Sequence, residues 1–165
     1  MFSVTLYVTV VGLRNNFDAS SVVLHEVSEY VSTEMMNALS LAQLSGSEEM
    51  FFYKVIVIPE AINNQGYTIE LVNDTDTLRW KVVAYLTQYP WVKGESELHF
   101  PFSNSTEVSC EDKPGYFDSY KIHYGPKLYS GVGHAGGSKM IVWCNVYIED
   151  GIKKVRVGIG VLESG

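Results

Sequence analysis

The chain opens with MFSVTLYVTVVGLRNNFDASSVVLHEVSEYVSTEMMNALSLAQL, residues 1–44. Apolar residues recur in this stretch at steps of three, four and seven, which is the heptad pattern of a helix with one apolar seam. Ser20 and Glu34 leave gaps in the seam, and its phase continues beyond each of them. The seam consists of Leu6, Val10, Leu13, Phe17, Leu24, Val27, Val31, Ala38 and Leu41.

A helix from Leu6 to Leu41 would be about 54 Å long, which is more than a compact domain of this size needs. Its apolar seam would therefore have to pack against something outside its own domain. A second interpretation applies to the first ten residues, because Phe2 to Val10 also alternates strictly between apolar and polar residues, as a half-buried strand does. The chain would then turn near Gly12 and begin its helix at Asp18 or Ser20.

Composition limits the classes of protein that the chain can represent. With 165 residues, 46% of them hydrophobic, the chain suffices for one cored domain plus an extension. Charged residues make up 19% and aromatic residues 13%, a profile typical of extracellular β-proteins and assembly surfaces. The net charge of −7 and the lack of a basic patch exclude nucleic-acid binding by phosphate neutralisation.

The apolar opening is too short to span a bilayer, because it stops at Arg14 and about 20 residues are needed. It resembles the lower end of a membrane helix, with Arg14, Asn15 and Asn16 at the lipid–water interface. An ordinary amphipathic surface helix is the alternative interpretation. In both cases residues 1–45 form an N-terminal hydrophobic helix, with an opening strand as the alternative for its first residues, and residues 50–165 form a separate head domain.

Short apolar runs separated by turn residues predict that the head is built from strands. The clearest pair is a hairpin in which two alternating runs flank Asp150–Gly151. The fold class is mainly β with a long N-terminal helix, and the head is an antiparallel β-sandwich. The predicted strands are Phe51–Ile58 (buried), Tyr67–Val72 (its hairpin partner), Leu78–Leu86, Glu97–Phe102 (an edge), Tyr116–Tyr124, Lys139–Ile148 and Lys153–Val161.

Cys110 and Cys144 allow a single pairing, and a disulfide is the expectation for an exported β-domain; two buried free thiols are the alternative. Asn73 and Asn104 each begin an Asn-x-Ser/Thr triplet in a predicted turn, which makes them candidate glycosylation sites.

Residues that could carry chemistry do not assemble into a recognisable site. The four histidines, His25, His99, His123 and His134, lack metal-ligand spacing. The G-x-G-x-x-G match at residues 131–136 leads into a strand, whereas dinucleotide binding requires a following helix. The sequence therefore predicts no catalytic residues, no metal and no cofactor, and the protein is not expected to be an enzyme.

Three passages resemble a known group of proteins. After the heptad helix comes YKVIVIPEAI at residues 53–62, followed by GYTIEL at residues 66–71. These resemble the aliphatic-x-aliphatic-Pro and Tyr-x-Ile-x-Leu passages of archaeal type IV pilin-like proteins and other class III signal-peptide surface proteins. The closing stretches Tyr129–Gly131, Gly137–Cys144 and Val157–Gly160 look like the last strands of the same group.

The resemblance implies an exported, archaeal cell-surface protein that is held in the membrane before assembly and then polymerises through its N-terminal helix. The chain departs from the group at its beginning, since the basic leader and most of the membrane helix are absent. Either the chain is a truncated form, or residues 2–10 are a strand donated to a neighbour.

The expected function is a structural subunit or accessory of an archaeal extracellular filament, a type IV pilus or archaellum-like assembly. Its partners would be further copies of the chain, or a membrane. The residues expected to form this assembly or membrane seam are Leu6, Val10, Leu13, Phe17, Leu24, Val27 and Val31. The alternative is a membrane-tethered binding module whose head recognises a surface-layer protein or a glycan.

Overall fold

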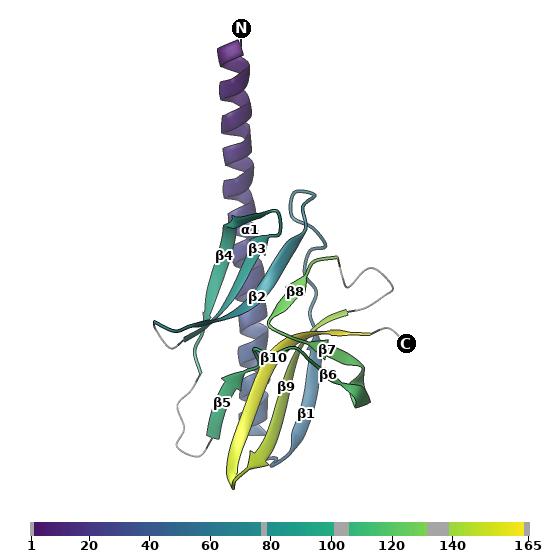
Figure 1. Ribbon diagram of the computed structural model, residues 1–165. Helices are drawn as coiled ribbons and strands as arrows, with labels where there is room; N and C mark the ends of the chain where they lie inside the picture. The colour runs from purple at the N-terminus through teal and green to yellow at the C-terminus, as the bar shows by residue number, and fades with distance from the viewer. Residues whose placement is uncertain (1, 77–78, 101–105, 132–138, 164–165) are drawn as a thin grey trace.

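A single long helix leads into a head of two β-sheets (Figure 1). The computed structural model describes residues 2–76, 79–100, 106–131 and 139–163, with the backbone alone for residues 2–11 and 13. Helix α1 spans Phe2–Leu44, 43 residues without a break. The predicted long helix is confirmed, and the alternative of an opening strand is wrong.

The first sheet contains the C-terminal hairpin at its centre. Its strands are β1 (Met50–Val55), β5 (Thr106–Cys110), β6 (Gly115–Phe117), β7 (Ile122–Tyr124), β9 (Lys139–Glu149) and β10 (Ile152–Leu162). The order is β1-β9-β10-β7-β6, and β5 pairs in parallel with the other half of the β10 edge. Asp150 and Gly151 connect β9 to β10 with positive φ angles of 53° and 75°, so the predicted hairpin and its turn are confirmed.

The second sheet is a three-stranded antiparallel meander with a fourth strand added at one edge. It contains β2 (Tyr67–Asp74), β3 (Arg79–Leu86), β4 (Tyr89–Leu98) and β8 (Lys127–Tyr129), in the order β4-β3-β2-β8. The two sheets form a sandwich-like head, so the protein is mainly β with antiparallel sheets and a long N-terminal helix.

The hydrophobic core is shared by the helix and both sheets. Helix α1 contacts β3 and β4 of one sheet and β9 and β10 of the other. One face of β9, including Met140, Val142 and Cys144, joins this core together with buried residues of α1. The opposite face of β9 places Ile141 and Trp143 in a second, smaller cluster.

Two of the predicted strand assignments fail in the first half of the head. Strand β1 is not buried: it is an edge strand whose Tyr53 and Val55 are more than a third exposed. It is also not the hairpin partner of β2, because β1 pairs with β9 and β2 pairs with β3 and β8.

The middle of the chain differs most from the prediction. The strand predicted at Tyr116–Tyr124 is divided into β6 and β7 by the 3-10 turn η1 (Asp118–Tyr120), which ends at Lys121 with a positive φ of 54°. The edge strand predicted at Glu97–Phe102 reaches only Leu98, the last residue of β4, and its residues 101–102 lie outside the described residues. Strands β5 and β8 and the first half of β4 were not predicted.

Candidate functional site

The N-terminal part of α1 extends beyond the head. Figure 1 shows the helix running past both sheets before it reaches the N-terminus. A β-carbon added at Gly12 would meet nothing within 4 Å, and Arg14 and Asn15 are exposed. We call residues 2–15 the projecting segment; at 1.5 Å per residue it is about 21 Å long.

Contacts between α1 and the head begin at Asn16 and Phe17, among the residues whose side chains the structure describes. The Phe17 ring lies 5.1 Å from the ring of Tyr89 at the start of β4. On the β1–β2 connection, the side-chain amide of Asn63 donates to the Ser20 hydroxyl at 2.7 Å. The start of β4 and the β1–β2 connection therefore hold the helix at the point where it leaves the core.

C-terminal to Ser20, the apolar face of α1 is covered by the head of the same chain. Leu24 and Val31 are 0% exposed and Val27 is 4% exposed, all three within the main core. The expectation that they form an assembly or membrane seam is corrected, because burial in the head leaves them no surface for a partner. Phe17 is partly buried on the same core.

A close backbone contact sets the position of α1 on β4. Gly94 lies so near the helix that an added β-carbon would be 2.1 Å from the backbone nitrogen of His25. His25 Nδ1 donates to the carbonyl oxygen of Glu95 at 3.0 Å. About two turns further along α1, the hydroxyls of Ser32 and Ser96 are 2.8 Å apart. These contacts fix which residues of α1 are buried and which project.

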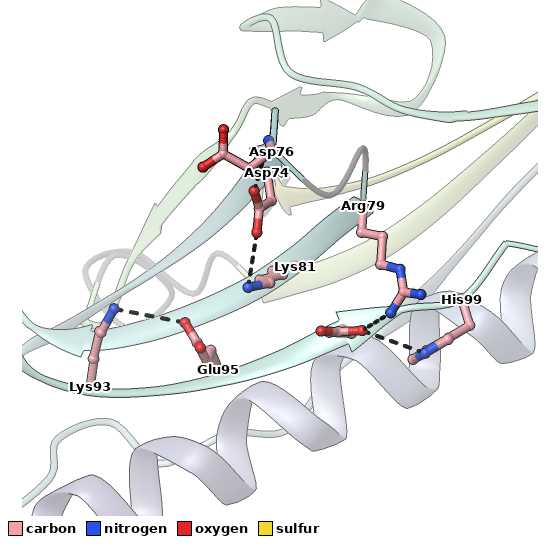
Figure 2. Close-up of polar contacts among 8 residues, drawn as sticks. Asp74, Asp76, Arg79, Lys81, Lys93, Glu95 and His99 are labelled. Carbon is pink, nitrogen blue, oxygen red and sulfur yellow. Dashed lines mark hydrogen bonds and ion pairs between the residues drawn. The ribbon is translucent and has the colours of Figure 1, made fainter.

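Charged side chains cover the face of β3 and β4 that points away from α1. Figure 2 shows Lys81 paired with Asp74 and Lys93 paired with Glu95. Arg79 and His99 both pair with Glu97, at 2.9 and 3.6 Å. The hydrogen bond to Asp74 raises the pKa of Lys81 above its ordinary value. Since acids and bases alternate and pair on the same surface, this face is a solvated, internally neutralised one.

The two cysteines are buried free thiols, so the expected disulfide is wrong. Cys110 of β5 and Cys144 of β9 are both in register with Val157 of β10, which lies between them. Two strand spacings separate their α-carbons by about 9.5 Å, and a disulfide bridges about 7 Å at most. Burial raises the pKa of both thiols, to about 12 for Cys144.

The glycosylation triplets fall on different kinds of structure. Asn73 is exposed, but it belongs to β2 and not to a turn, opposite Trp80 of β3. Asn104 lies outside the described residues, as do His134 and most of the glycine-rich stretch at 131–137. Within the described residues no three His, Cys, Asp or Glu side chains gather as metal ligands would.

Over the part of the chain that the structure describes, no helical stretch combines the length and the hydropathy that crossing a bilayer requires. Comparisons with protein-family models, with curated proteins and with solved structures found no match to this chain.

The structure thus reduces the candidate site to the projecting segment, which carries Leu6, Val10 and Leu13 of the expected seam. The sequence analysis missed two sets of contacts that position α1: the collar around Phe17 and the close approach of the helix to β4. The collar of Phe17, Tyr89 and Asn63 depends on contacts between residues far apart in the chain, and Tyr89 was not assigned to a strand. A glycine in the middle of β4, Gly94, was the one local signal of a close backbone approach.

Proposed function

We propose that the protein is a structural subunit or accessory of an archaeal extracellular filament, of the type IV pilus or archaellum-like kind. The observation that carries the proposal is the projecting segment, an uncharged stretch from Phe2 to Leu13 on a helix that runs beyond its own head. A helix that is apolar on most of its surface is typically surrounded by protein or by lipid. Further support is the arrangement of one long helix ahead of a two-sheet head, to which the sequence resemblance also points.

The assembly force would be burial of the projecting segment against neighbouring subunits. Full burial contributes about 1.5–3 kcal/mol per large aliphatic side chain, or about 5–9 kcal/mol for Leu6, Val10 and Leu13 together. Bringing two proteins together costs an estimated 4–15 kcal/mol in lost freedom of motion. Burial of these three side chains alone therefore makes a pairwise contact marginal, and a stable contact must also bury the apolar surface that receives the segment.

The packed part of α1 gives this assembly a defined geometry. Because the helix is continuous from Phe2 to Leu44, the head is joined to the projecting segment without a hinge. The collar at Phe17 and Tyr89 and the close approach at Gly94 hold the head in one orientation around it. Each copy would then place its head at the same angle outside a helical core.

The test is a double substitution, Leu6→Asp with Val10→Asp, in the full chain. We expect loss of multimers in sedimentation and electron microscopy, with the near-ultraviolet circular dichroism of the head unchanged. Phe17 is excluded from the variant because it packs on Tyr89 and its loss would disturb the head. Val22→Asp is the matched control, since Val22 is 60% exposed on the head-covered part of α1. Multimers that persist in the double variant would overturn the proposal.

A membrane-tethered binding module is the second candidate, and the exposed Trp91 on β4 favours it. Trp91 is 70% exposed and lies 5.3 Å from the ring of Tyr89. Large amphipathic rings are enriched at recognition surfaces, such as those for a surface-layer protein or a glycan. A wild-type chain that binds purified surface layers as a monomer, and loses this binding with Trp91→Ala, would favour this function over the filament.

A further inference from the structure

A second apolar surface lies at the opposite end of α1 from the projecting segment. Leu41 and Leu44 in the last turns of the helix are 60% and 84% exposed, although large aliphatic side chains are normally buried. Together with residues at the start of β1 they line a depression of about 480 Å³. We call it the basal groove; its lining residues are Leu41, Leu44, Ser45, Met50, Phe51 and Phe52.

We propose that the basal groove of one copy receives the projecting segment of a second copy, an assignment that rests on the proposed function and specifies its contact. The two surfaces match in chemistry. The groove is lined by five apolar residues and one serine, and the projecting segment has no charged residue before Arg14. The groove lining itself carries no charge, and the exposed acids nearest to it in the chain, Glu48 and Glu49, lie in the connection between Ser45 and Met50. The lining therefore suits an apolar occupant, and the matching apolar segment is present on every copy.

Their placement determines the kind of assembly that results. Val10 and Leu41 are separated by 31 residues of one uninterrupted helix, about 46 Å at 1.5 Å per residue. A contact between two different surfaces of the same chain is heterologous, and it produces an open filament whenever the rotation between copies does not close a ring. Because the two surfaces lie at opposite ends of a straight helix, successive copies add along the direction of α1.

Other surfaces of the protein are less suited to this contact because they carry paired charges. The outward face of β3 and β4 is occupied by paired charges such as Lys81 with Asp74. Glu34, about two helical turns before Leu41, is paired with Lys54 of β1 at 2.6 Å, so this flank of α1 is neutralised as well. Among the described surfaces, the basal groove combines exposure, concavity and apolar lining.

The experiment uses complementation between two full-length variants. Leu44→Asp places a charge in the groove and leaves the segment intact, whereas Val10→Asp disables the segment and leaves the groove intact. Leu44 is 84% exposed, so its replacement does not disturb the core, and Val57→Asp at an 83% exposed position of the head is the matched control. Sedimentation velocity measures the size of each variant alone and of their equimolar mixture.

We expect wild type and Val57→Asp to polymerise, and each of the other variants alone to be monomeric, with a critical concentration raised at least tenfold. Their mixture should form a one-to-one dimer and stop there, because a single intact segment and a single intact groove remain to meet. This capped dimer is the signature of a heterologous contact.

Other results separate this inference from the function on which it rests. Polymers of Leu44→Asp like those of wild type would overturn the groove assignment and leave the filament proposal standing. Monomers that fail to dimerise on mixing would also overturn it. A wild-type chain that never polymerises would overturn both. Loss of flotation with phosphatidylcholine vesicles, without any loss of self-association, would assign the groove to lipid and likewise overturn the inference.

Discussion

Replacing Gly94 with alanine tests how α1 is positioned on the head. The added methyl carbon would lie 2.1 Å from the backbone nitrogen of His25 and 2.5 Å from the carbonyl carbon of Leu24. Both atoms belong to helix backbone, which cannot rotate away as a side chain does. To restore ordinary contact of about 3.4 Å, the helix and β4 must separate by more than 1 Å.

The expected loss of stability can be derived from the buried residues whose packing this separation would weaken. Leu24, Val27 and Val31 are buried beside the contact, and each contributes about 1.5–3 kcal/mol by burial. A gap of 0.5–1 Å forfeits a quarter to a half of a packing contact, and alanine recovers about 0.5–1 kcal/mol as a better strand residue than glycine. We expect a net loss of about 2–3 kcal/mol in the free energy of unfolding.

Urea unfolding followed by tryptophan fluorescence measures this loss. With a slope of about 2 kcal/mol per molar urea, the midpoint should fall by about 1–1.5 M. Gly12→Ala is the matched control: its added methyl meets nothing within 4 Å, and alanine favours the helix, so the midpoint should not fall. A Gly94→Ala midpoint equal to that of wild type would refute the close approach of α1 to β4, and with it the boundary of the projecting segment.

Three further predictions concern the head. The two buried thiols should not react with Ellman's reagent in the native protein and should both react in denaturant, because burial raises their pKa values; a disulfide by mass spectrometry would contradict this. Tyr67→Phe should lower stability by about 1–2 kcal/mol in urea unfolding, since the Tyr67 hydroxyl donates to the Pro59 carbonyl, and an unchanged midpoint would show that this bond is dispensable. The pKa of Glu149 is lowered by its hydrogen bond to Lys154, so the pair stabilises the fold above the unfolded pKa of the carboxyl, and this contribution is lost as the pH falls through the lowered value. Lys154→Met should therefore have a lower urea midpoint than wild type at neutral pH and the same midpoint in strong acid; a gap that persists in acid would exclude the ion pair as its cause.

Helix α1 and the β9–β10 hairpin could be predicted from the sequence, because the pattern of each lies within one continuous stretch of the chain. The heptad phase predicted α1, because its continuity over many turns outweighs the strand preference of the β-branched residues between Phe2 and Val10. The alternating runs around Asp150 and Gly151 predicted the β9–β10 hairpin, since both residues accept the left-handed conformations that the turn requires.

Features that depend on distant pairing were beyond local patterns. The partner of β1 is β9, almost ninety residues later, so its place at a sheet edge could not be inferred from its own apolar run. The same is true of Cys110 and Cys144, whose separation depends on the parallel insertion of β5 beside β10.

The candidate site could be predicted only in part for a different reason. A heptad seam and the buried face of a core helix have the same apolar spacing. The sequence could not tell that Leu24, Val27 and Val31 are covered by the head while the N-terminal part of α1 extends beyond it.

The continuity of α1 has a mechanical consequence for any assembly that is put under tension. A pull on the N-terminal end of the helix is directed along its axis, parallel to the line of contacts that runs from Phe17 to the last turn. Contacts loaded in this shearing direction resist together, whereas contacts peeled from one end break in succession. Pulling α1 out of the head would require all of these helix–head contacts to break together, so each subunit would resist a high force along the helix axis.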